Sequence, residues 1–137
     1  MIIDATDLIL GRLASYTAKK ALLGEKLDII NSEKSVISGK KKQIYNNSLR
    51  KRQRGIPLQG PYYPRQPDAL VRRTIRGMIP YKTDRGKKAF KNIHCWVGVP
   101  PKLKDKKAET IKQAAASKLP YLKYTAVGNI CKLMGSK

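Results

Sequence analysis

Three closely spaced arginines have the spacing and the chemistry to bind phosphate groups. Arg76 follows Arg72 and Arg73 by four and three positions, which places the side chains on neighbouring positions of a helix surface. A guanidinium group is planar, stays charged at neutral pH and can donate to two phosphate oxygens at once. The spacing therefore predicts a helix with a cationic face suited to a phosphate-bearing polymer.

A second basic group lies upstream of these arginines. Seven Lys and Arg residues occur in the fifteen positions 40–54 without one acidic residue. The next segment, 55–67, is rich in glycine and proline and carries Tyr62, Tyr63 and Arg65, so we expect an extended loop. Basic loops of this kind enter the grooves between helices of a folded RNA.

The charge of the whole chain supports this interpretation. Thirty Lys and Arg residues against nine Asp and Glu give 137 residues a net charge of +21. Residues 1–33 hold four of these bases and five of these acids, so all of the positive excess lies after residue 33. Such self-repulsion disfavours a compact free protein and is explained most simply by a polyanionic partner. Lysine runs alone also occur as plain solvated surface, but clustered arginines with interleaved tyrosines and prolines favour nucleic acid.

Residues for other chemistry are sparse. The only histidine is His94, and the acids that a hydrolase or metal site would need are scattered: Asp4, Asp7, Glu33, Asp68 and Asp84. A metal site made from His94, Cys95 and Cys131 would lack a fourth ligand. We find no glycine-rich nucleotide loop. We therefore expect no enzymatic activity, no cofactor and no metal, a core or hydrogen-bonded histidine, and two buried, reduced cysteines.

The first third of the chain predicts an α/β nucleus over residues 1–39. Apolar residues at helical spacing run from Leu10 to a stop at Gly24, between a short strand at 1–3 and a second strand at 27–30. A third strand is expected at Val36-Ile37. A strand, a helix and a strand in this order favour a parallel βαβ unit.

The remaining elements are predicted in three groups within a single domain, 1–137. Residues 40–67 form a basic helix, anchored by Ile44, Tyr45 and Leu49, and the extended loop. Residues 68–100 form the arginine-faced helix, whose inward positions include Met78, and the last core strand. Gly77 is predicted to permit close backbone approach at the end of that helix. Residues 101–137 form a C-terminal helical part, with a helix over 108–118 and an apolar segment over 121–134 that covers the sheet.

Two segments of the chain resemble one known family. The first is Asp4-Ala5 with Leu10-Gly11-Arg12-Leu13-Ala14-Ser15 and Ala18-Lys19, followed by Ile30-Asn31-Ser32-Glu33 and Ile37-Ser38-Gly39. The second is Arg73-Thr74-Ile75-Arg76-Gly77-Met78-Ile79-Pro80, continued by Tyr81-Lys82-Thr83 and Arg85-Gly86. Together they cover most of residues 2–100 and are similar to the universal large-subunit ribosomal protein L13 family. The Tyr81-Lys82-Thr83 continuation and the lysine-rich C-terminal part are similar to its archaeal and eukaryotic branch.

This resemblance implies a fold, a function and a set of contacts. The implied fold is a three-layer α/β/α domain around a four-stranded, mainly parallel sheet, with basic extensions. The implied function is structural, in binding and stabilising folded large-subunit rRNA during ribosome assembly. Carried onto this sequence, the RNA-facing residues are Lys40, Lys41, Lys42, Arg50, Lys51, Arg52, Arg54, Arg65, Arg72, Arg73, Arg76, Lys82, Arg85, Lys87 and Lys88.

The expected partners are large-subunit rRNA and neighbouring ribosomal proteins, with no membrane and no small-molecule substrate. No apolar run approaches the roughly 18 residues of a membrane span, and Asp4 interrupts the N-terminus before a signal-peptide core, so we expect a cytoplasmic location. Charge alone would also suit a general nucleic-acid-binding or DNA-compacting protein. A small metal-dependent nuclease is a further alternative, which the scattered acids disfavour.

Overall fold

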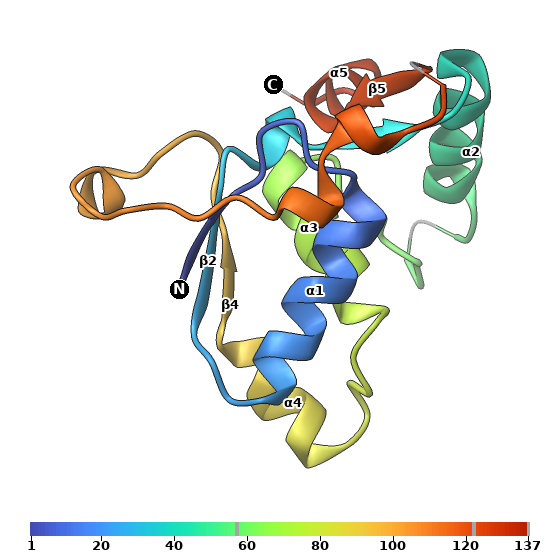
Figure 1. Ribbon diagram of the computed structural model, residues 1–137. Coiled ribbons are helices and arrows are strands. Elements are labelled where there is room, and N and C mark those ends of the chain that lie inside the picture. The colour runs from blue at the N-terminus through green and yellow to red at the C-terminus, as the bar shows by residue number, and fades with distance from the viewer. Residues whose placement is uncertain (57, 122, 137) are drawn as a thin grey trace.

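The computed structural model describes residues 1–56, 58–121 and 123–136. Its central element is a parallel sheet in the order β1 (Ile2–Asp4), β2 (Leu27–Ile30) and β4 (Ile93–Cys95). Ile3 lies opposite Ile29, which in turn lies opposite Cys95. Helices α1 (Leu10–Leu22), α3 (Pro67–Arg76) and α4 (Asp84–Lys91) lie on one side of this sheet (Figure 1). The predicted mixed α/β class is confirmed.

Helix α1 forms as its apolar spacing predicts. Its buried side is made of Leu10, Leu13, Ala14, Thr17, Ala18 and Ala21, and its last turn carries Lys19 and Lys20, where cations suit the helix dipole. The chain leaves the helix through Gly24 at a φ of +95°, a conformation that glycine adopts without strain. The helix connects β1 to β2 and buries its apolar side against the sheet.

Helix α3 begins with Pro67 at its first position and buries Leu70, Val71 and Ile75. The prediction that Met78 points inward is wrong, because Met78 is 43% exposed whereas Ile79 is 6% exposed. The helix ends at Arg76, and the chain then turns through the bonds Met78 N to Ile75 O and Ile79 N to Arg76 O. Because of this turn, the residue that points into the core is Ile79, one position after Met78.

The strand near residue 36 exists but has a different partner. Strand β3 (Val36–Ser38) pairs antiparallel with β5 (Tyr124–Ala126) in a separate two-stranded sheet. Before it, Asn31 adopts a φ of 54° and the short 3₁₀ turn η1 (Ser32–Lys34) redirects the chain away from β2. Helix α5 (Val127–Leu133) follows β5 and contributes Val127, Ile130 and Cys131 to the main core. The four-stranded sheet and the three-layer arrangement are not confirmed.

The helix predicted over 108–118 is wrong. This segment contains only the 3₁₀ turns η3 (Lys112–Ala114) and η4 (Ala116–Lys118), and a further turn, η2 (Pro101–Leu103), precedes it. Backbone bonds hold the segment along the N-terminal strand and loop: Glu109 N to Ile2 O at 2.9 Å and Ile9 N to Ala114 O at 2.8 Å. In an α-helix over 108–118 the nitrogen of Lys118 would donate to Ala114 O, but here it donates to Ala115 O, and Ala114 O accepts from Ile9 N instead.

Candidate nucleic-acid interface

Helix α2 (Lys41–Gln53) carries the most basic segment of the chain and buries none of its residues fully. Its half-buried side includes Ile44, Tyr45 and Leu49, as predicted, and the Tyr45 hydroxyl donates to the carbonyl of Leu133 at 3.5 Å. The exposed cations of this helix and its ends are Lys40, Lys41, Lys42, Arg50, Lys51 and Arg54. The helix therefore lies on α5 along one edge and leaves most of its charge in solvent.

The three lysines at the start of α2 stand where a helix already carries partial positive charge. Its first turn contains no acid. Cations at a helix N-terminus are unfavourable by roughly 0.3–1 kcal/mol each at low salt, because they add to the positive end of the dipole. When an anion binds there, both the lysines and the helix dipole attract it, so the same placement becomes favourable. The placement of Lys40, Lys41 and Lys42 thus favours a polyanionic partner.

Arg52 differs from its neighbours because it is half-buried and holds the C-terminal end of α5. Its Nη1 donates to the carbonyl of Met134. A Cβ added to Gly135 would lie 3.9 Å from Nη1 of Arg52 and 3.9 Å from Nη1 of Arg65, so both guanidinium groups meet beside this glycine. Two cations at the negative end of a helix dipole are stabilising.

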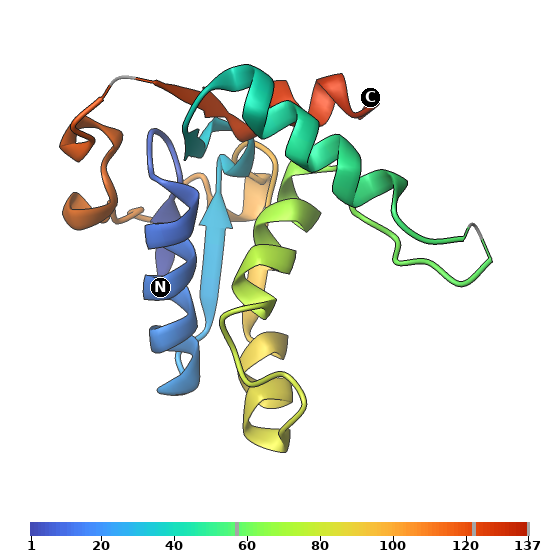
Figure 2. The ribbon, with the colours of Figure 1, turned by 90° about the vertical axis from the view of Figure 1, so that its right-hand side faces the viewer.

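The loop between α2 and α3 projects away from the rest of the protein (Figure 2). At its base, Arg52, Arg54, Tyr62, Tyr63 and Arg65 line a hollow of about 530 Å³. Tyr62 is 70% exposed. Arginines bind phosphates and tyrosine rings stack with bases, so this combination is suited to RNA. The structure thus brings together residues that the sequence places 13 positions apart.

The arginines of α3 do not form one open cluster, which corrects the sequence prediction. Each guanidinium lies over a different aromatic ring. The distance from the guanidinium carbon to the ring centroid is 4.6 Å for Arg72 over Phe90, 5.0 Å for Arg73 over Tyr63 and 5.3 Å for Arg76 over Tyr81. Arg73 also donates to the carbonyl of Tyr62 at 2.7 Å. Arg72 and Arg73 are half-buried and Arg76 is exposed.

These ring contacts connect α3 to α4. Tyr81 and Phe90 meet edge to face, with centroids 5.4 Å apart, so Arg72, Phe90, Tyr81 and Arg76 form one continuous stack. The stack fixes the turn that begins α4. Around it lie the remaining predicted cations, all exposed: Lys82, Arg85, Lys87 and Lys88.

The predicted residues therefore fall into two basic regions. One consists of α2 and the 54–66 loop, and the other surrounds α4 at the opposite end of the molecule (Figure 2). Helix α3 joins them. Within α4, Thr83 caps the first turn by accepting from Gly86 N at 3.2 Å, and Lys87 pairs with Asp84 at 3.5 Å in an exposed, weak ion pair.

Of the two roles predicted for His94, core or hydrogen-bonded, the core role is wrong. His94 is exposed on β4, because strand side chains alternate and Ile93 takes the buried side. Burial raises the pKa of Cys95 to about 12 and that of Cys131 to about 11, so both are protonated thiols. Cys131 is buried as predicted, and Cys95 is half-buried. The described part of the chain contains no group of three residues able to hold a metal ion.

Two exposed cations on α1, Arg12 and Lys19, are not among the residues predicted to face RNA. The near-neutral balance of residues 1–33 concealed them, but most of the acids in that segment are bound within the protein. Three of their carboxylates accept hydrogen bonds: Asp4 from the Asn31 side chain, Asp28 from Trp96 Nε1 at 3.2 Å, and Glu33 from the Gly98 backbone nitrogen at 3.0 Å. A fourth, that of Glu25, forms an ion pair with Lys20 at 2.8 Å. The sequence of α1, which has three bases and no acid, was the available signal.

Among residues 1–56, 58–121 and 123–136, no helix is long and apolar enough to cross a membrane.

The family model described as Ribosomal protein L13 matches residues 1–102. Proteins named large ribosomal subunit protein uL13 are similar over nearly the whole chain. That of Methanosarcina barkeri is 46% identical over 137 residues, which are 99% of this chain and 98% of the relative. That of Methanopyrus kandleri is 43% identical over 136 residues (98% and 86%), and that of Archaeoglobus fulgidus 38% over 135 residues (98% and 86%).

Proposed function

Since this chain belongs to the ribosomal protein L13 family, we propose that it is a structural constituent of the large ribosomal subunit that binds large-subunit rRNA. The family is one of structural proteins and not of enzymes. The observation that carries RNA binding is the hollow at the base of the 54–66 loop, where three arginines meet two tyrosines. The relatives reported above are archaeal, in agreement with the branch that the sequence resembles.

The proposed mechanism is electrostatic. The N-terminal α/β unit acts as a rigid base, and the basic segments from Gly39 to Lys91 lie against RNA backbone. Neutralising crowded phosphates releases counterions and lets separate RNA helices approach each other. The protein thus stabilises folded rRNA during assembly, in the cytoplasm, together with neighbouring large-subunit proteins.

The proposed RNA-binding residues are those named from the sequence, and the structure supports dividing them by role. Arg52, Arg72 and Arg73 are half-buried and contact other groups of the protein, so they hold the neighbouring segments in place and also add positive charge to the surface. The exposed cations provide the direct phosphate contacts in this proposal. Arg54 and Arg65 line the hollow and are the sharpest test of it.

We also propose a single domain and, for the parallel sheet, a fourth strand position. One core cluster contains residues from Ile3 to Met134, which supports a single domain. Ile3 forms a parallel bridge with Glu109, which supports a fourth position at the β1 edge. The segment after β4 leaves the sheet on the side away from α1, where a third layer would lie (Figure 1).

The proposal is tested first by sedimentation of the native protein from a cell extract through a sucrose gradient. Co-migration with the large subunit after a wash of about 0.5 M salt, which screens loose ionic contacts, is the expected result. Migration with DNA or at the top of the gradient would favour the general nucleic-acid-binding alternative.

The residues are tested by the salt dependence of binding to purified large-subunit rRNA. Arg54→Ala with Arg65→Ala should lower the slope of log K against log salt by about 0.7–0.9 for each phosphate that the variant no longer neutralises. The matched control, Arg54→Lys with Arg65→Lys, keeps both charges and should keep the slope, although it cannot form the paired guanidinium bonds. An unchanged slope in the alanine variant would show that this hollow faces away from RNA.

A further inference from the structure

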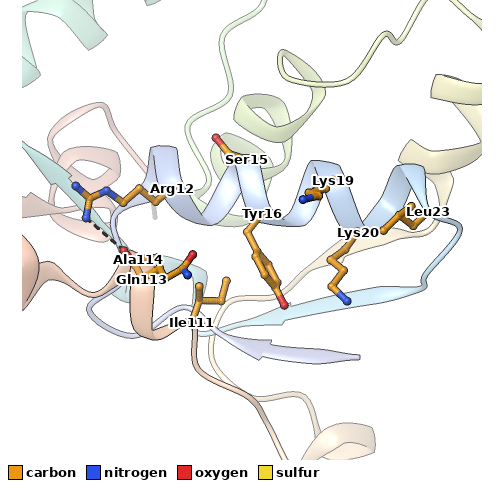
Figure 3. A pocket seen from close by; sticks show the side chains of 9 residues that line it. All are labelled: Arg12, Ser15, Tyr16, Lys19, Lys20, Leu23, Ile111, Gln113 and Ala114. Carbon is orange, nitrogen blue, oxygen red and sulfur yellow. Dashed lines mark hydrogen bonds between the residues drawn. The ribbon is translucent and has the colours of Figure 1, made fainter.

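A second hollow lies on the other side of the molecule from the 54–66 loop. Helix α1 and the 111–114 segment line a groove of about 590 Å³, which Figure 3 shows from close by. This volume lies within the roughly 300–1,000 Å³ of known ligand pockets. None of the residues predicted to bind RNA lines it.

The groove combines a cationic rim with an apolar floor. Arg12 and Lys19 stand on its α1 side, two helical turns or about 10.5 Å apart along the axis. Tyr16 lies between them and points toward Ile111, which forms the opposite wall (Figure 3). Leu23, at the far end of the groove, is 68% exposed. A flat, partly apolar ligand that carries negative charge at its edges fits this arrangement.

The two rim cations are not neutralised within the described part of the chain. Neither Arg12 nor Lys19 forms an ion pair there, and Arg12 makes only a 3.3 Å bond to the carbonyl of Gln113. Lys20 also lines the groove, but it is paired with Glu25. The net charge of the groove is therefore positive.

We propose that this groove is a second RNA site, which accepts one unpaired nucleotide of large-subunit rRNA. The base lies in the hollow against Tyr16 and Ile111, and the flanking phosphates contact Arg12 and Lys19. Unpaired bases that stack on aromatic side chains beside basic groups are the usual targets of RNA-binding proteins. An acidic peptide would use the same cations, but a base also fills the apolar floor with a flat ring.

This inference rests on the proposed function and adds a geometric consequence to it. Helix α1, which forms one side of the groove, and the loop between α2 and α3 lie on opposite sides of the protein (Figure 2). A chain that holds RNA at both places connects two RNA segments across its own width. The protein then acts as a bridge between those segments and not only as a neutralising surface.

The test is hydroxyl-radical footprinting of purified large-subunit rRNA bound to the full chain. The wild type should protect two separate RNA segments. Arg12→Ala with Lys19→Ala should leave one segment unprotected and keep the other, and should lower the salt slope by about 0.7–0.9 for each phosphate no longer neutralised. Arg54→Ala with Arg65→Ala should show the reverse pattern. Lys26→Ala, an exposed lysine outside the groove, is the charge control and should change neither segment.

Tyr16 tests the base contact separately from the charge. Tyr16→Leu should weaken protection of the nucleotide in the groove, whereas Tyr16→Phe should preserve it, because the phenyl ring still stacks. The retained second footprint in each variant shows that the protein is folded.

Three outcomes would overturn the inference. The α1 double variant could keep both footprints, which would show that the groove does not hold RNA, or it could lose both, which would show that the groove is not a separate site. Equal protection by Tyr16→Leu and the wild type would remove the base from the groove. If the wild type protects no RNA at all, the proposed function itself fails, and that result is distinct from the other three.

Discussion

Gly86 should be the least replaceable glycine of the basic region around α4. A Cβ built on it would lie 2.0 Å from the carbonyl oxygen of Pro80 and 3.1 Å from the nitrogen of Tyr81. Favourable non-bonded carbon contacts begin at about 3.5 Å, so Gly86→Ala must separate α4 from the preceding turn by more than about 1 Å. Both neighbouring atoms belong to the backbone, which cannot rotate away as a side chain can.

The size of the effect follows from what this turn holds. Overpacking costs about 1–3 kcal/mol, and loss of the Thr83 cap adds about 1 kcal/mol. If the contact between the rings of Tyr81 and Phe90 is broken, the loss of stability grows by a further 0.5–1.5 kcal/mol or so. Replacing glycine by alanine within a helix recovers about 0.5–1 kcal/mol of stability. We therefore expect Gly86→Ala to lower the free energy of unfolding by about 1.5–5 kcal/mol.

Urea unfolding of wild type and variant measures this difference directly. The matched control is Gly11→Ala on α1, where an added Cβ meets no atom within 4 Å. That variant should be more stable than the wild type by up to about 1 kcal/mol, because alanine favours a helix. Equal stability of the two alanine variants would refute the reasoning from the close approach of Pro80 to Gly86.

Two further predictions concern ionisable groups. Burial raises the pKa of the Asp4 carboxyl. The hydrogen bonds that this carboxyl accepts from the Asn31 side chain and from the backbone N–H and hydroxyl of Thr6 lower its pKa by more, so that the pKa lies below 3.8. The stabilisation from Asp4 is therefore present above its unfolded pKa and is lost as pH falls through the folded value. Asp4→Asn should show a smaller loss of stability than wild type between about pH 5 and pH 2 in acid titrations followed by circular dichroism. Burial also raises the thiol pKa values of Cys95 and Cys131, so iodoacetamide at about pH 8 should label both far more slowly in native than in urea-unfolded protein. Equal labelling rates in the two states would contradict the burial of these thiols.

The sequence predicted the elements whose signals are local. Apolar spacing and Gly24 defined α1, and Pro67 with Leu70, Val71 and Ile75 defined α3. The segment 108–118 is rich in alanine and lysine and favours a helix locally, but its backbone pairs with Ile2 and Ile9, more than a hundred positions away. Helix propensity is weak compared with such tertiary pairing.

For the site, the sequence predicted which residues are charged but not how each is held. Arg72, Arg73 and Arg76 stack on rings from three other segments, and no local pattern specifies those partners. Gly77 was predicted to allow close backbone approach, but its φ is −66° and an added Cβ would meet Thr74 O at an ordinary 3.4 Å. The close approach lies at Gly86, where only the folded turn brings Pro80 near.

The contacts between α2 and the end of the chain affect how the protein is made. The most basic helix is held by Tyr45 on Leu133 and by Arg52 on Met134, and Gln66 accepts from Ser136 at 3.0 Å. Because a ribosome adds residues in order, at about 5–20 per second, Leu133 and Met134 are synthesised 88 and 82 positions after Tyr45 and Arg52. During that interval a nascent chain exposes α2 as an undocked cationic arm. Synthesis of α5 and the turn after it, and not folding of the N-terminal unit, is the event that sets this arm in place.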